Sequence, residues 1–151
     1  MKIVSGIAAS LVAMSILVAA PASAGEMGQS EKLRRLDIML MVTGLRCRKT
    51  ADDFQPEYGQ FTTNHIAELN AAARAIKADY AAHYGPAGAD RALDKISVQM
   101  ANEFGNGHPW LNCAQLKQVA GSLAQMDGAE PLFAAADDLL SNGSHQLAWM
   151  H

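Results

Sequence analysis

Apolar side chains recur every three or four residues along most of the chain beyond residue 30, a spacing that places them on one face of an α-helix. The clearest stripe lies in residues 57–84 and consists of Tyr58, Phe61, His65, Leu69, Ala72, Ile76, Tyr80 and His83. Pro56 precedes this stripe at a position that suits the first turn of a helix, and Gly85-Pro86 follows it. The pattern therefore predicts one long helix over residues 57–84.

Four further segments have the same spacing. They are residues 31–45, 89–104, about 113–126 with Asn112 as the N-terminal cap, and 131–140. In the first of them Met41 and Val42 widen the apolar band, which predicts a helix buried on most sides. No alternation of period two with β-branched residues persists along the chain, so a sheet is not expected. These segments predict an all-α fold, a single compact bundle of four or five helices.

The N-terminal residues have a different pattern. Lys2 is followed by an apolar run over residues 3–20, then by Pro21 and the small-residue triplet Ala22-Ser23-Ala24. A positively charged N-terminal region, a hydrophobic region and an A-x-A cleavage site are the parts of a secretory signal peptide. The alternative is an N-terminal membrane anchor. We expect a signal peptide over residues 1–24, cleaved after Ala24, with export to the periplasm or beyond. A helical domain over residues 25–141 would follow, then a C-terminal tail over residues 142–151 that docks on the bundle or is disordered.

Charge narrows the possible partners. Removing 24 of the 151 residues takes away one base, Lys2, and leaves 127 residues with 11 basic and 15 acidic side chains. This balance argues against nucleic-acid binding, and the absence of a second long apolar run argues against a membrane span in the mature chain. Bases gather early (Lys32, Arg34, Arg35, Arg46, Arg48 and Lys49) and acids late (Asp127, Glu130, Asp137 and Asp138). The two ends either attract each other within the fold or offer a basic face to an anionic partner.

The two cysteines, Cys47 and Cys113, both belong to the part predicted to be exported. In an oxidising compartment such a pair usually forms a structural disulfide. Closing a loop between them would stabilise the fold by about 4 kcal/mol in the chain-entropy model. Two free thiols with redox activity are the alternative, but the C-x-x-C spacing that lowers a thiol pKa is absent. We therefore predict a disulfide between the end of the first helix and the start of the helix after Asn112.

A loop with a specified shape precedes the second cysteine. Residues 104–113 include two glycines, a histidine, a proline and a tryptophan, and the disulfide would bring them close to the basic residues beside Cys47. The sequence thus predicts a binding surface formed by Arg46, Arg48, Lys49, His108 and Trp110. The alternative is structural: Trp110 closes one end of the bundle while His108 hydrogen-bonds a helix end.

Signals for catalysis and for metals are weaker. His65 and Glu68 are one helical turn apart and form a possible base–carboxylate pair, although His65 lies on an apolar stripe, as core histidines do. The five histidines include no H-E-x-x-H motif, and there is no C-x-x-C-H or G-x-S-x-G motif. No catalytic residue, metal ligand or cofactor is therefore assigned.

The function indicated is that of a small exported protein that acts by binding in the cell envelope, with an envelope protein or an anionic envelope component as partner. Two alternatives remain: a small envelope hydrolase that uses His108 or the His65–Glu68 pair, and a carrier that holds a cofactor or lipid noncovalently in the bundle. A chaperone form of the binding hypothesis adds that acid would charge His65 and His83 on the buried stripe and loosen the bundle.

Overall fold

The computed structural model describes the backbone of residues 22–141 and the side chains of residues 28–141. This part of the chain contains six α-helices and no strand, so the all-α prediction is confirmed and the expected number of helices, four or five, is wrong. The helices are α1 (Ala22–Cys47), α2 (Gln55–Asn64), α3 (Ile66–Tyr84), α4 (Pro86–Glu103), α5 (Cys113–Ala124) and α6 (Ala129–Leu140).

The additional helix arises because the segment predicted as one helix over residues 57–84 is bent at His65, where α2 ends and α3 begins. The backbone N–H of His65 still donates to the Phe61 carbonyl, and that of Leu69 donates to the His65 carbonyl. The helical spacing of the apolar residues therefore continues across the bend. What distinguishes the bend is a pair of tertiary hydrogen bonds, from Asn64 and His65 to carbonyls at the end of α5, which no local pattern encodes.

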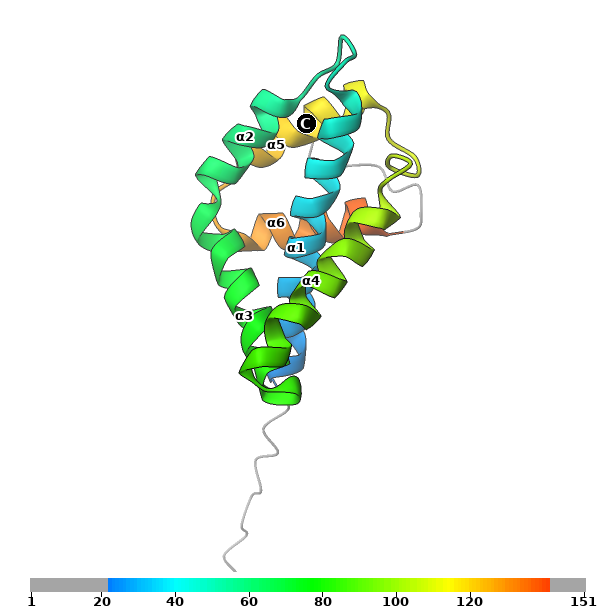
Figure 1. The fold of residues 1–151 in the computed structure, drawn as a ribbon. Coiled ribbons are helices and arrows are strands. Elements are labelled where there is room, and N and C mark those ends of the chain that lie inside the picture. The colour runs from blue at the N-terminus through cyan, green and yellow to red at the C-terminus, as the bar shows by residue number, and fades with distance from the viewer. Residues whose placement is uncertain (1–21, 142–151) are drawn as a thin grey trace, which may run out of the picture.

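Helix α1 is the central element and contacts the five other described helices (Figure 1). Its inner face carries fully buried side chains that join those of α2, α5 and α6 in one core, including Leu33, Leu36, Met39, Leu40, Phe54, Phe61, Leu116, Leu123, Leu132 and Leu139. The prediction that this helix is buried on most sides is wrong near its C-terminus, because Met41 and Leu45 are 39% and 47% exposed.

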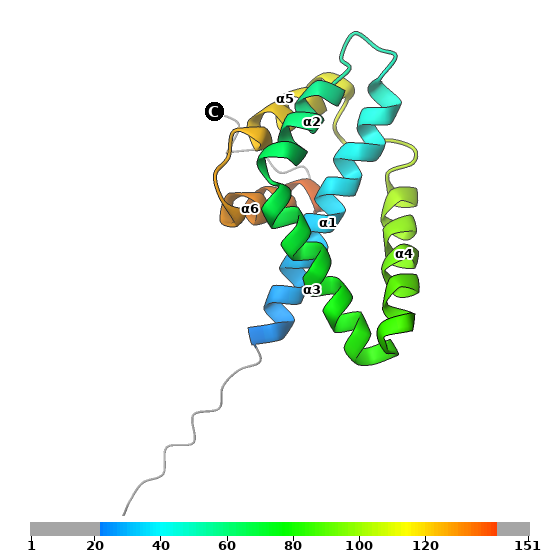
Figure 2. The same ribbon diagram turned by 60° about the vertical axis from the view of Figure 1, so that its left-hand side comes forward.

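The other helices form two groups around α1. Helices α3 and α4 form a hairpin along the N-terminal half of α1, with Gly85 at positive φ between them. Helix α2 packs on α5, and α6 packs on α1 (Figure 2). The tip of the α3–α4 hairpin therefore lies at the opposite end of the molecule from the C-terminus of α1.

Polar contacts fix the ends of these helices. Asn112 caps α5 as predicted: its side chain accepts from the Gln115 backbone N–H, and the Gln115 side chain accepts from the Asn112 backbone N–H. Lys32 on α1 pairs with Asp137 on α6, which confirms for this pair that the basic start and acidic end of the sequence attract each other. No helix in residues 22–141 is long and apolar enough to cross a membrane.

Helix α1 begins earlier than the predicted residue 31 and includes the predicted cleavage triplet Ala22-Ser23-Ala24. Most of the predicted signal peptide, residues 1–21, lies outside the described part of the chain, as does the C-terminal tail over residues 142–151. Cleavage after Ala24 and docking of the tail therefore stay predictions.

Candidate functional site

The disulfide between Cys47 and Cys113 is present, with the two Cα atoms 5.7 Å apart. It joins the last residue of α1 to the first residue of α5, as predicted. Because Cys47 is almost completely buried, the bond anchors the start of α5 in the core. The basic residues beside Cys47 and the loop before Cys113 are thereby held at the same end of the molecule.

His108 in this loop serves the fold through both ring nitrogens. Its Nε2 lies 2.9 Å from the Leu139 carbonyl oxygen in the last turn of α6, where helix carbonyls lack a partner in their own helix. Its Nδ1 accepts from the Leu111 backbone N–H at 3.2 Å, which requires a neutral ring with the hydrogen on Nε2. Burial lowers the pKa of His108, and the Leu139 carbonyl opposes this effect in part. The structural alternative for His108, a hydrogen bond to a helix end, is therefore confirmed.

Trp110 lies beside this histidine and packs on the core. The two rings meet edge to face, with their centroids 4.7 Å apart, and the indole is half-buried against the apolar cluster. The ring of Phe104 is nearly parallel to that of His108, with the two centroids 6.3 Å apart. The aromatic residues of this loop thus pack on one another, and only part of the indole remains on the surface.

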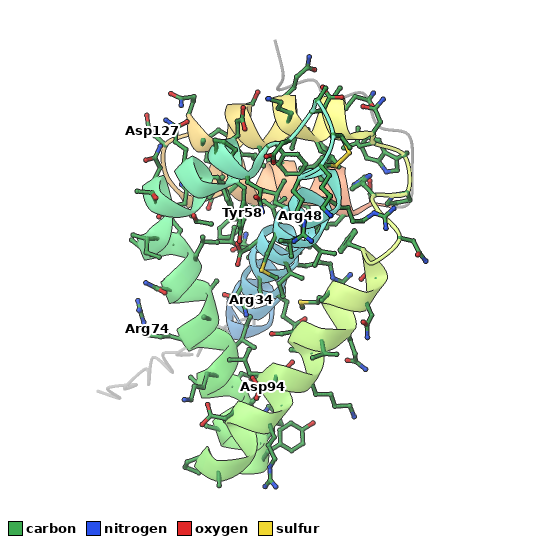
Figure 3. All side chains as sticks on the ribbon, turned by 45° about the horizontal axis from the view of Figure 1, so that its top comes forward. Arg34, Arg48, Tyr58, Arg74, Asp94 and Asp127 are labelled. Carbon is green, nitrogen blue, oxygen red and sulfur yellow. A yellow bond between two sulfur atoms is a disulfide. The ribbon has the colours of Figure 1, made fainter. Side chains whose placement is uncertain are left out.

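The basic residues beside Cys47 have different environments. Arg46 donates from Nη1 to the Gly105 carbonyl at 2.9 Å and so fastens the loop to the end of α1. Arg46 and His108 line one hollow of about 240 Å³ next to the disulfide. Arg48, labelled in Figure 3, and Lys49 follow α1 in an exposed turn and form no ion pair with a residue of the described range. Arg46, His108 and Trp110 are thus brought together, and Arg48 and Lys49 are exposed in the turn that follows α1.

His65 and Glu68 line a second hollow, of about 360 Å³, where α2 and α3 meet the end of α5. The Nε2 of His65 donates to the Leu123 carbonyl at 2.8 Å, which leaves Nδ1 as an acceptor that is buried and without a partner in the described structure. No hydrogen bond joins His65 to Glu68. His65 is buried as predicted, whereas the prediction for His83 is wrong, because its side chain is 65% exposed.

Metal chemistry finds no support among the described side chains. Within residues 28–141, no three His, Cys, Asp or Glu side chains are grouped so that they could hold a metal ion.

One polar cluster was not recognised from the sequence. Tyr58 on α2 donates its hydroxyl to Asp37 on α1 at 3.0 Å, and Arg34 contacts the other Asp37 oxygen at 3.4 Å while reaching Ser97 on α4. Tyr58 and Arg34 are labelled in Figure 3. Burial raises the pKa of Asp37, against the lowering effects of the Tyr58 hydroxyl and the Arg34 charge. Burial and the neighbouring carboxylate also raise the pKa of Tyr58. The sequence contained one indication of this cluster: Arg34 and Asp37 are opposite charges three residues apart within an apolar stripe.

In comparisons with known proteins, no family model, no curated protein and no solved structure matches this chain.

Proposed function

We propose that this chain is an exported helical protein with one disulfide bond and that it acts by binding a partner in the cell envelope. The observation that carries the proposal is a surface at the C-terminal end of α1, formed by Met41, Leu45, Arg48 and Lys49 and here named the α1 end surface. Met41 and Leu45 lie one helical turn apart and are both exposed, and the two bases follow directly in the next turn. Apolar contact area beside uncompensated charge is a usual composition for a recognition surface.

The size of the electrostatic effect favours a protein partner over a lipid surface. Two exposed cations contribute about 1 kcal/mol each at an anionic membrane, which is too little for stable attachment. An envelope protein with an acidic surface supplies the same attraction and, in addition, apolar area against Met41 and Leu45. The disulfide at Cys47 supports this surface by limiting movement of the turn that carries the two bases.

Of the two candidate sites for a hydrolase, His108 and the His65–Glu68 pair, the structure argues against the first. His108 has no nitrogen left for proton transfer, because both ring nitrogens bond the backbone. His65 retains a lone pair on Nδ1, but this atom is buried, so a substrate would reach it only after a local rearrangement. The binding function requires no such movement.

Site-specific photo-cross-linking in the envelope of the producing cell tests this proposal. With a photoreactive residue at position 45, we expect one discrete protein adduct that the double substitution R48E/K49E removes. The control is R74E, which reverses another exposed base that makes no ion pair in the described structure. An adduct that survives R48E/K49E, or that disappears equally with R74E, would contradict a partner recognised at the α1 end surface.

Export is tested separately by fractionation and intact-mass measurement. We expect the protein in the periplasmic or secreted fraction with a mass that begins at Gly25 and is two hydrogens lighter than the reduced chain. A full-length chain retained in the cytoplasm would refute export.

A further inference from the structure

A groove lies far from the disulfide, between the end of α3 and α4 over residues 88–99. It has a volume of about 600 Å³, within the range of about 300–1,000 Å³ typical of small-ligand sites. Two tyrosines of α3, Tyr80 and Tyr84, form one wall, and Arg91 and Lys95 of α4 form the other. The helical spacing placed Tyr80 on the apolar stripe of residues 57–84 and indicated no role for Tyr84, Arg91 or Lys95.

The aromatic wall presents ring surface to solvent. Tyr84 is 66% exposed, more than any other large apolar residue with a described side chain, and its ring meets Tyr80 edge to face at 6.1 Å. Burial and the nearby Glu31 carboxylate raise the pKa of Tyr80, so its hydroxyl stays protonated. Gly88 allows α4 to approach this wall, because a Cβ at that position would lie 2.8 Å from the Cβ of Tyr84.

The basic wall carries charge that the fold does not neutralise. Arg91 and Lys95 are one helical turn apart, about 6 Å along the axis, and neither forms an ion pair in residues 28–141. Three nearby acids have other partners: Asp90 pairs with Lys77, Asp79 lies beside His83, and Glu31 accepts a hydrogen bond from the Tyr80 hydroxyl. Asp94 is exposed and does not line the groove. Two adjacent cations therefore remain to receive an anion.

We propose that this groove binds an acidic sugar of an envelope polysaccharide, at a site separate from the α1 end surface. The polarised C–H groups on the face of a sugar ring pack on the negative face of a tyrosine ring, and the sugar carboxylate pairs with Arg91 and Lys95. The Gln99 side-chain amide lines the groove and offers hydrogen bonds to sugar hydroxyls. The Tyr80 hydroxyl is already hydrogen-bonded to Glu31, so Tyr80 contributes its ring. An acidic peptide satisfies the two cations but has no rigid ring to cover Tyr84, and a neutral sugar leaves both cations unpaired.

The test is calorimetric titration of the mature, oxidised protein at low salt with trigalacturonate, using maltotriose and triglutamate as matched neutral and peptide probes. We expect trigalacturonate to bind and the other two to bind at least about tenfold more weakly. R91Q/K95Q should weaken trigalacturonate binding about tenfold or more, and Y84A should also weaken it, whereas R74Q should leave it unchanged. The replaced side chains are exposed, and circular dichroism checks that each variant is folded.

A further variant tests the groove without changing its charge. G88A introduces a Cβ 2.8 Å from the Cβ of Tyr84, so the start of α4 must move away from the end of α3, and trigalacturonate binding should weaken. Lack of trigalacturonate binding, equal binding of maltotriose or triglutamate, or equal loss with R74Q would each overturn the proposal. These outcomes are independent of the cross-linking test, because R48E/K49E lies at the other end of the molecule and should not affect trigalacturonate binding.

Discussion

For His65 and His108, the sequence indicated a possible role of the side chain but not the atom that it bonds. Each was a candidate for catalysis or for a structural role, and each donates from Nε2 to a carbonyl at a helix end, Leu123 and Leu139 respectively. The structural role of His108 was foreseen as an alternative, but its acceptor was not. The acceptor lies 31 residues along the chain, and only the packing of α6 beside the loop brings it within reach.

His108 should make the stability of the protein depend on pH. Burial lowers its pKa in the folded state, so the unfolded chain takes up the proton first as the pH falls below about 6.5. The stability that neutral His108 provides is present above that pH and is lost below it. We expect the free energy of unfolding to fall between about pH 7.5 and 5.5, and to fall less in H108Q, whose amide still donates to Leu139.

Urea denaturation across this range measures the effect, with H83Q as the control because His83 is exposed. A slope in H108Q equal to that of the unmodified protein would show that His108 is not responsible.

The hydroxyl of Tyr58 should contribute to stability through a single hydrogen bond. Y58F removes the donor to Asp37 and leaves a half-buried carboxylate with one contact fewer, so we expect a loss of about 1–2 kcal/mol. Y84F, at an exposed tyrosine, should change stability by less than about 0.5 kcal/mol. Equal effects of the two substitutions in urea denaturation would mean that the Asp37 contact contributes nothing.

At the scale of helices, the sequence predicted where most elements lie but not where one of them bends. Pro56, Gly85-Pro86 and Asn112 act through local backbone chemistry, and each lies at or beside a helix boundary in the structure. The bend at His65 has no such local signal, because backbone hydrogen bonds continue through it. At the bend, Asn64 and His65 donate to carbonyls at the end of α5, and a spacing pattern contains no information about that distant partner.

The capping box at the start of α5 should be worth about 1 kcal/mol. N112A removes the side-chain acceptor for the Gln115 N–H, so we expect α5 and the whole protein to lose about 0.5–2 kcal/mol. N112D retains the acceptor and adds a negative charge at a helix N-terminus, and it should stay close to the unmodified protein. Thermal unfolding compares the two variants; an equal loss in both would show that the cap is not what position 112 contributes.

At the scale of the whole molecule, the sequence predicted contacts between distant residues only where few residues could be the partner. Two cysteines allow one intramolecular disulfide, and the separation of bases from acids indicated attraction between the chain ends, seen in the Lys32–Asp137 pair. The exposure of Met41 and Leu45 and the groove beside Tyr84 had no such signal. They are surfaces that other helices leave uncovered, and they depend on how α3 and α4 pack on α1.

The disulfide should account for a large share of the stability of the mature protein. Its two cysteines are 66 residues apart, so reduction restores the entropy of a long loop to the unfolded chain and should cost about 4 kcal/mol in the chain-entropy model. Small domains have a net stability of about 5–15 kcal/mol, so the reduced protein should be folded but much closer to its unfolding threshold.

Urea denaturation with and without reductant measures this loss, and hydrogen exchange locates it. We expect exchange to increase first in the loop over residues 104–112 and in the turn of Arg48 and Lys49, because the bond joins these two segments. The variant C47A/C113A is the control, since reductant should leave its stability unchanged. A loss below about 1 kcal/mol on reduction would mean that the hydrogen bonds of Arg46 and His108 hold this end of the bundle without the disulfide.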